Sequence, residues 1–215
     1  MYFDSRRSTV LATHGMVATS QPLAAMAGVR ILMEGGNAVD AAIASAAVLN
    51  VVEPVSTGVG GDMFALIWNN KDKSIQAING SGRSGMASTI DALKAEGHDT
   101  MPQRGVHSVT VPGAVHGWET LLNECGTMPL FHLLQPAIQY AEEGYPVSDI
   151  ISFQWSNQVE MLSKLPSGQE MLLNGKAPKH GDILKIPTLG RTLRAIAEGG
   201  SEAFYNGDIA EKMAA

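Results

Sequence analysis

One segment of this chain, the fifteen residues from Ala38 to Val52, limits the possible folds more than any other. It reads AVDAAIASAAVLNVV, with Asp40 as its only charge, so the helix that it predicts is apolar or small on nearly every face. Such a helix has to be buried, and its alanines allow close packing, which we expect to occur against a sheet. Asn37 stands in position to cap this helix, and Glu53-Pro54 ends it.

The flanking segments predict a helix before this one and a strand after it. Ser20-Gln21-Pro22 is typical of a cap followed by a first-turn proline, and apolar residues then recur at helical spacing over 23–32. Gly35-Gly36 stops that first helix. The glycine-rich turn Gly58–Gly61 leads into an apolar strand, Met63–Trp68.

The rest of the chain favours a few short strands and then a run of helices. Because the strands are too few to cover the helices, we predict an α+β fold in which helices dominate, with residues 1–215 as one incomplete domain. The remaining elements are expected as strands at Ser74–Ile78 and Ser108–Val111, helices at Asp91–Glu96, Ala114–Glu124, Leu130–Glu143, Asp149–Leu162, Thr188–Glu198 and Ser201–Ala214, and a polar loop at Pro166–Asp182.

Composition is that of a globular protein and argues against several partners. The chain is 45% hydrophobic and 17% charged, and its net charge of −6 is spread without blocks. Because Lys and Arg form no cluster, neither a nucleic acid nor an anionic membrane is expected as a partner. The longest apolar run is too short to span a bilayer, and MYFDSRRSTV lacks the apolar region of a secretory signal. We expect a cytoplasmic location, or a periplasmic or secreted one if a leader has been removed.

Cysteine and histidine give no signal for a metal. The single cysteine, Cys125, cannot form an internal disulfide, and it precedes Gly126 at the end of a helix that would not activate a thiol. The six histidines are scattered, and no Cys/His cluster has zinc spacing. We therefore expect no metal and no cofactor, and a structural role for Cys125.

Two glycine-rich loops match neither a phosphate cradle nor a nucleophile motif. At Gly58–Gly61 the helix comes before the turn and the strand after it, the reverse of a phosphate cradle, so we expect a backbone that needs positive φ or close approach. In Asn79–Gly85, Arg83 stands among glycines; its planar fork suits a carboxylate, and the alternative is a solvated arginine in a flexible loop. Neither Ser81 nor Ser84 lies in G-x-S-x-G.

Three carboxylates near the buried helix have two interpretations. Asp40, Glu53 and Asp62 border the buried helix and the glycine turn, so they could form an acid/base pair or could pair with neighbouring backbone N–H groups. Trp118 is expected in the core, and His116 is expected as a hydrogen-bonded partner rather than a base.

Four stretches, in this order, resemble the large subunit of the gamma-glutamyltranspeptidase family. The first combines GMVATSQPLAAMAGVRIL, GGNAVDAAIASAAVLNVVEP and STGVGGDMF; the others are SVTVPGAVHGW, LLQPAIQYAEEGYPVS and PTLGRTLRAIAEGGSEAFYNGDIAEKMA. The resemblance covers almost the whole chain, and its first stretch is long and specific. It implies part of an N-terminal-nucleophile hydrolase fold, a four-layer αββα sandwich.

The resemblance also implies an enzyme, a gamma-glutamyltransferase and hydrolase that acts on glutathione-like γ-glutamyl amides. In that family a proenzyme cleaves itself and exposes a threonine, which attacks the amide; water or an amino acid then accepts the acyl group. The threonine opens the small subunit in a Thr-Thr-His-like run, which this chain lacks, and Thr127 and Thr188 are interpreted as helix-flanking residues. We therefore assign no catalytic residue here and expect the rest of the large subunit and the small subunit as partners.

Arg83 is the one substrate-binding residue that the resemblance carries over. Typical members bind the substrate α-carboxylate through an Arg-Glu pair after the second strand, whereas Gly82 and Ser84 flank Arg83 here. This loop is more similar to the cephalosporin-acylase-like branch, so an acylase of another amide is the alternative function. A catalytically silent fragment that binds or assembles is a third. The resemblance also places the turn Gly58–Gly61 in the layer that supports the active site.

Overall fold

The structure, a computed structural model, describes residues 8–214. In chain order its elements are α1 (Pro22–Met33), α2 (Ala38–Val52), β1 (Met63–Asn69), β2 (Ser74–Gly80), α3 (Ile90–Ala95), the 3₁₀ turn η1 (Val106–Ser108), α4 (Ala114–Cys125), α5 (Leu130–Glu143), β3 (Tyr145–Pro146), α6 (Asp149–Ser156), α7 (Val159–Ser163), the 3₁₀ turn η2 (Pro166–Met171), β4 (Ile183–Leu184), α8 (Pro187–Tyr205) and α9 (Asp208–Ala214).

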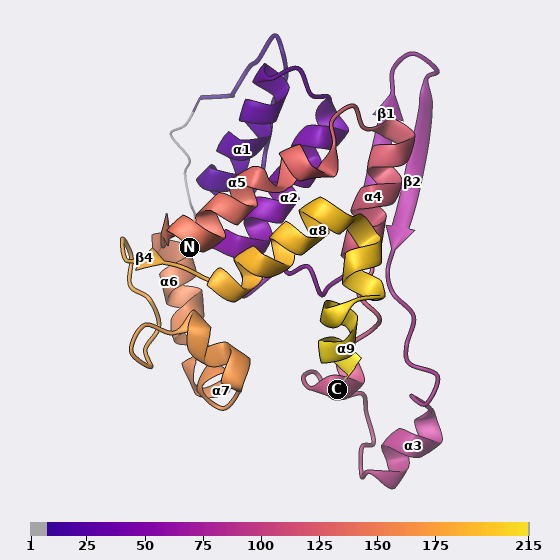
Figure 1. Cartoon of the computed structure of the whole chain (residues 1–215), viewed down its shortest axis with the longest axis vertical. Helices are drawn as coiled ribbons and strands as arrows, with labels where there is room; N and C mark the ends of the chain where they lie inside the picture. The colour runs from indigo at the N-terminus through magenta and orange to yellow at the C-terminus, as the bar shows by residue number, and fades with distance from the viewer. Residues whose placement is uncertain (1–7, 215) are drawn as a thin grey trace.

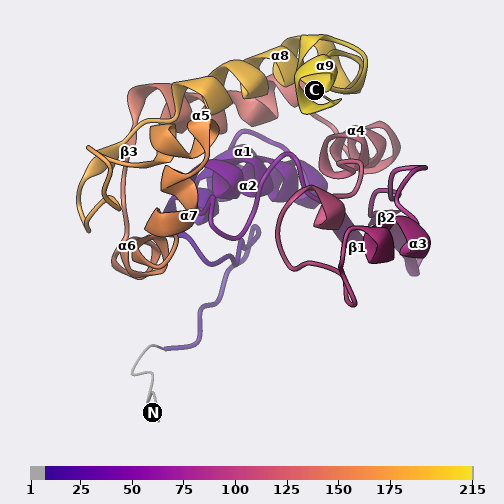
Figure 2. The same cartoon turned by 90° about the horizontal axis from the view of Figure 1, so that it is seen from below.

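Helices stack to form the main body of the molecule. α2 packs on α1 and α5, and α5 packs in turn on α8 (Figures 1 and 2). The antiparallel β1–β2 hairpin and α4 lie along one side of this body, and α3 projects beyond the end of the hairpin (Figure 1). No helix within residues 8–214 has the length and apolar character needed to cross a membrane. The N-terminal segment in which no secretory signal was found lies largely outside the described residues.

The central helix α2 is buried as predicted, except along one stripe. Eleven of its fifteen residues are buried, and the others recur every three or four positions: Ala38, Ala42, Ala46 and Leu49. Its neighbours are α1, α5 and, to a smaller extent, α4. The hairpin strands β1 and β2 are not among these main neighbours, so packing of α2 against a sheet stays a prediction that concerns strands outside residues 8–214.

Of the two helix caps predicted near the N-terminus, one is confirmed and the other is wrong. Asn37 caps α2 as predicted, and Asp40 completes a capping box by accepting from the Asn37 N–H at 2.8 Å. Ser20 does not cap α1, which begins after Gln21 without a side-chain cap. The Ser20 hydroxyl instead donates to Glu53 Oε2 at 2.5 Å, so it joins the start of α1 to the end of α2.

The hairpin presents two different faces because side chains alternate along a strand. Met63, Ala65 and Ile67 are half-buried and pack against the helical core. On the other face of β1 the side chains are large and apolar but lie open, with exposed fractions of 68% for Phe64, 80% for Leu66 and 55% for Trp68. Both predicted strands of the hairpin are confirmed, each one or two residues longer than expected.

The strand predicted at Ser108–Val111 is wrong. Ser108 belongs to η1, Val109 after it is extended, and residues 109–113 join no ladder. The Val111 N–H donates to the Arg83 carbonyl at 2.9 Å, and the Gly113 N–H donates to the Gly61 carbonyl at 3.0 Å. A strand needs a paired neighbour along its length. Within the described residues no strand lies beside this segment to form the remaining hydrogen bonds of a ladder.

The helices of the second half are confirmed with two breaks. The helix expected at Asp149–Leu162 divides into α6 and α7, because the Asn157 side chain donates to the Phe153 carbonyl that the next helical N–H would use. The helix expected at Ser201–Ala214 divides at residues 206–207: its first part continues α8 beyond the kink at Gly200 (φ +63°) to Tyr205, and its second part is α9, which starts at Asp208. The predicted polar loop at Pro166–Asp182 contains η2 and a buried leucine.

Candidate functional site

Three separate segments meet at the carboxylate of Asp62, which follows the glycine turn. Its Oδ1 accepts from the Gly82 N–H at 3.1 Å and from the Thr110 hydroxyl at 3.2 Å, and its Oδ2 accepts from the Ser81 hydroxyl at 3.3 Å. These donors lie on the loop after β2 and on the segment before α4. Asp62 therefore connects the two loops. Of the two interpretations of this carboxylate from the sequence, an acid/base pair or pairing with backbone N–H groups, its contacts match the second.

Backbone contacts lock the same loops together. The N–H groups of Gly113 and Ala114 both donate to the Gly61 carbonyl at 3.0 Å, so the glycine turn closes on the start of α4. A Cβ on Gly82 would lie 1.5 Å from the Val111 carbonyl oxygen, and one on Gly113 would lie 2.0 Å from that of Gly80. Only glycine fits at these two crossings, which explains why this region is rich in glycine.

The turn Gly58–Gly61 has the predicted order, helix before and strand after, and is not a phosphate cradle. Its glycines do not need positive φ, so that part of the expectation is wrong. The close approach is found instead, because a Cβ on Gly61 would lie 3.2 Å from the Gly58 carbonyl oxygen. A pocket of about 230 Å³ lies beneath the turn and is lined in part by Asn50, Asp62 and Trp118.

Arg83 extends from this junction. Its carbonyl is held by Val111, its side chain is exposed, and no hydrogen bond or ion pair joins its guanidinium to any residue between 8 and 214. The backbone at Arg83 is thus fixed by its neighbours while the charged group is open to solvent. Its assignment as a carboxylate-binding group remains a prediction.

The other two carboxylates serve the fold and form no acid/base pair. Glu53 accepts from Ser20. Asp40 is fully buried and accepts from the Thr127 N–H at 2.9 Å, the Thr127 hydroxyl at 2.5 Å and the Met128 N–H at 3.3 Å, besides Asn37. Burial raises the pKa of Asp40, but these hydrogen bonds outweigh burial and hold the pKa below its ordinary value.

The remaining candidates have structural surroundings. The hydroxyls of Thr127 and Thr188 donate to Asp40 and Glu170 at the flanks of helices, as interpreted from the sequence. Cys125 is the last residue of α4, and its Sγ donates to Gln76 Oε1 of β2 at 3.1 Å.

His116 and Trp118, which both lie on α4, have different surroundings. Trp118 is buried as expected, but the ring of His116 is exposed. It is the backbone N–H of His116 that is bonded, to the Tyr205 hydroxyl at 3.2 Å. The prediction that the His116 side chain serves as a hydrogen-bonded partner is therefore wrong.

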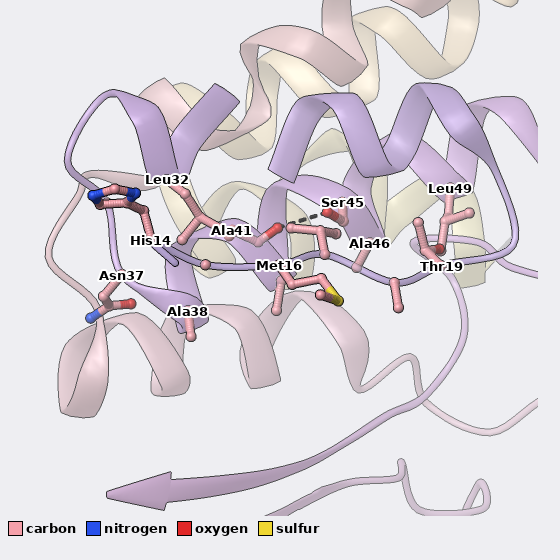
Figure 3. Close-up of a pocket in the computed structure, with 15 residues that line it drawn as sticks. His14, Met16, Thr19, Leu32, Asn37, Ala38, Ala41, Ser45, Ala46 and Leu49 are labelled. Atoms are coloured by element: carbon pink, nitrogen blue, oxygen red, sulfur yellow. Dashed lines mark hydrogen bonds between the residues drawn. The ribbon is translucent and has the colours of Figure 1, made fainter. Parts of the chain in front are cut away.

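One cavity beside α2 was not predicted from the sequence. It has a volume of about 560 Å³ and lies between the extended residues 14–19 and the exposed stripe of α2 (Figure 3). Its lining is mainly apolar, and the hydroxyl of Ser45 is used within the helix by the Ala41 carbonyl at 2.8 Å. Among the described residues that line it, His14 is the only titratable one, so this part of the cavity has the character of a packing groove.

Comparison with known proteins assigns this arrangement to a family. The family described as Gamma-glutamyltranspeptidase matches residues 24–215. The "Glutathione hydrolase-like YwrD proenzyme" of Bacillus subtilis (strain 168) is 42% identical over 207 residues, which are 95% of this chain and 39% of the relative. The crystal structure of cephalosporin acylase from Bacillus halodurans has a TM-score of 0.92 and 44% identity, covering 98% of this chain and 40% of that one. The crystal structure of the Helicobacter pylori gamma-glutamyltranspeptidase has a TM-score of 0.90 and 30% identity, covering 96% of this chain and 60% of that one.

These likenesses confirm the predicted fold class. Residues 8–214 have the arrangement of the matching part of an N-terminal-nucleophile hydrolase, with helices dominant. The chain spans about two fifths of the length of the Bacillus subtilis relative and of the Bacillus halodurans acylase.

Proposed function

Because this chain belongs to the gamma-glutamyltranspeptidase family, we propose that it is part of an enzyme that hydrolyses γ-glutamyl amides such as glutathione or transfers their acyl group. The observation that carries the proposal is the position of Arg83, exposed after β2 on a loop that Asp62 and Val111 hold in place. A guanidinium on such a backbone suits a substrate carboxylate, since only the side chain and not the loop has to be ordered on binding.

In this proposal the residues of the chain position the substrate and do not react with it. The attacking group is a threonine at the start of a small subunit outside these 215 residues, and its own α-amino group accepts the proton. Arg83 holds the substrate α-carboxylate, and water or an amino acid accepts the acyl group. The Bacillus subtilis relative is named as a proenzyme, which supports a precursor that is cleaved into two subunits. A cytoplasmic location is part of the proposal.

An acylase with another acyl group is the second candidate. The solved structure described as a cephalosporin acylase is 44% identical to this chain, and Arg83 lacks the flanking Arg-Glu pair of typical transpeptidases. An enzyme of this kind would keep the carboxylate contact but would not need the α-amino group of a γ-glutamyl substrate.

Three anilides test both candidates on the complete enzyme, meaning this chain together with the subunit that carries the proposed threonine. γ-Glutamyl anilide carries the α-amino group and the α-carboxylate, glutaryl anilide lacks the amino group, and 4-aminobutyryl anilide lacks the carboxylate. A γ-glutamyl enzyme should cleave the first far faster than the other two, whereas an acylase should prefer the glutaryl compound. Turnover by a homogeneous polypeptide of only these 215 residues would contradict the proposed threonine mechanism.

A further inference from the structure

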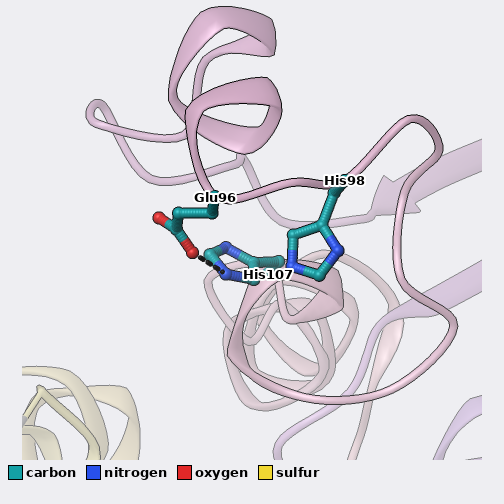
Figure 4. Close-up of side chains that lie close together, drawn as sticks. All are labelled: Glu96, His98 and His107. Atoms are coloured by element: carbon teal, nitrogen blue, oxygen red, sulfur yellow. Dashed lines mark ion pairs between the residues drawn. The ribbon is translucent and has the colours of Figure 1, made fainter.

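A cluster of three metal-ligand side chains lies where α3 ends, and its first member follows Arg83 by 13 positions. It consists of Glu96, His98 and His107, whose ligand atoms all lie within 4.8 Å of one another (Figure 4). His107 Nε2 is 2.8 Å from Glu96 Oε2, and the rings of His98 and His107 meet edge to face at 5.5 Å. Although the histidines are scattered in the sequence, the fold brings these two together.

Two local structures fix the backbone on each side of the cluster. α3 ends in a Schellman motif, in which Gly97 has φ +88° and donates to the Lys94 carbonyl while the His98 N–H donates to that of Leu93. This motif places Glu96 and His98 on either side of Gly97. His107 sits in η1, which follows Gly105 at φ +97°. The three side chains thus come from two short turns rather than from one flexible loop.

We propose that Glu96, His98 and His107 bind a divalent transition-metal ion, with Zn²⁺ as the preferred occupant. Two imidazoles and a carboxylate are a common zinc ligand set, and imidazole nitrogens select zinc over Mg²⁺ or Ca²⁺. With metal–ligand bonds of about 2.0–2.2 Å, neighbouring ligand atoms of a tetrahedral site lie roughly 3.3–3.6 Å apart. Small side-chain rotations within the present cluster reach that spacing, and a water molecule completes the fourth position.

The metal would stabilise a segment that lacks a core of its own. Neither α3 nor η1 has a buried residue, and the segment projects from the body (Figure 1). A metal bound across the cluster closes the loop between positions 96 and 107 and holds α3 against η1. Without metal, the partly exposed ion pair between Glu96 and His107 and the edge-to-face contact of the two imidazoles do so, and exposed ion pairs contribute little.

The test is zinc titration of the untagged complete polypeptide after treatment with a chelator, in competition with a chromophoric zinc indicator. One zinc ion should bind, and His98→Ala or His107→Ala should weaken it by about tenfold or more, as expected for loss of a ligand. His180→Ala is the matched control, since His180 is exposed and outside the cluster, and should bind zinc like the parent. Equal affinity in all four proteins, or no binding by the parent, would overturn the site.

A second measurement separates metal binding from simple damage to the fold. Zinc should slow proteolysis within residues 90–108 of the parent protein and should have no such effect on the His107→Ala variant. In the absence of zinc both proteins should have the same circular dichroism and unfolding midpoint, because His107 is not in the core. Zinc binding without this protection would overturn the clamping role.

Discussion

The backbone N–H and the hydroxyl of Thr127 both donate to the carboxylate of Asp40, at 2.9 and 2.5 Å, although 87 positions separate the two residues. Asp40 lies in the first turn of α2, and Thr127 lies in the link between α4 and α5. One buried carboxylate therefore joins three helices. The same side chain also closes the capping box of α2 with Asn37, so it is the polar centre of the helical body.

Asp40→Ala is expected to lower the free energy of unfolding by about 3 kcal/mol or more. The change leaves the N–H groups of Asn37, Thr127 and Met128 without an acceptor, at roughly 1–3 kcal/mol for each group that stays dry. Asp149→Ala is the matched control, because Asp149 also lies in the first helical turn but is exposed, and its loss should stay below about 1 kcal/mol. Urea unfolding measures both, and similar losses would contradict the role of Asp40.

The lowered pKa of Asp40 also predicts how stability depends on pH. A carboxyl group whose pKa is lower in the folded state contributes stability above its unfolded pKa, about 3.9 for aspartate, and this contribution is lost as pH falls through the folded pKa. The parent protein should lose stability over this acid range. Asp40→Asn, which cannot ionise, should show a smaller slope of unfolding free energy against pH below about pH 4. An unchanged slope would show that other carboxyl groups cause the acid sensitivity.

The glycine crossings at the candidate site allow a comparison of two neighbouring positions. Gly82→Ala should destabilise the protein by about 1–3 kcal/mol or more, because the new Cβ would lie 1.5 Å from the Val111 carbonyl oxygen. Gly85→Ala adds the same methyl group three residues later, where nothing lies within 4 Å, and should be nearly neutral. Thermal unfolding compares the two variants, and equal midpoints would contradict the backbone contact seen here.

Local interactions account for the predictions that were confirmed. The cap at Asn37 depends on residues within three positions, so its pattern is readable in the sequence. The cap predicted at Ser20 was wrong because its hydroxyl pairs with Glu53, 33 positions away. Similarly, Ser108–Val111 has the composition of a strand, but a strand forms only where a partner lies beside it.

The candidate site depends on contacts between distant segments, which the sequence shows only in part. Asp62 was recognised as a polar residue beside the glycine turn, but its partners Gly82 and Thr110 lie 20 and 48 positions away. The clustering of His98 with His107 likewise requires the turn at Gly105. Arg83 was singled out by its glycine neighbours and by the family resemblance, and neither one determines what its guanidinium binds.

Arg83→Ala in the complete enzyme is expected to raise KM for γ-glutamyl anilide by tens-fold or more. Removing one partner of a desolvated, hydrogen-bonded charge pair costs about 2–5 kcal/mol, and this loss falls on substrate binding. Arg83→Lys should restore the affinity only in part, because an ammonium group cannot present two parallel donors to one carboxylate. Arg191→Ala, a change at an exposed arginine on α8, is the control and should leave KM unchanged.

The choice of substrate separates a carboxylate contact from a general disturbance of the loop. Arg83→Ala should raise KM for γ-glutamyl and glutaryl anilides, which both carry the carboxylate, and should affect 4-aminobutyryl anilide much less. A loop that had merely lost its shape would lower activity on all three compounds. The Asp62 and Val111 hydrogen bonds involve the backbone of Gly82 and Arg83, so the substitution leaves them in place. Equal losses on all three substrates, or no loss on any, would identify Arg83 as a solvated loop residue.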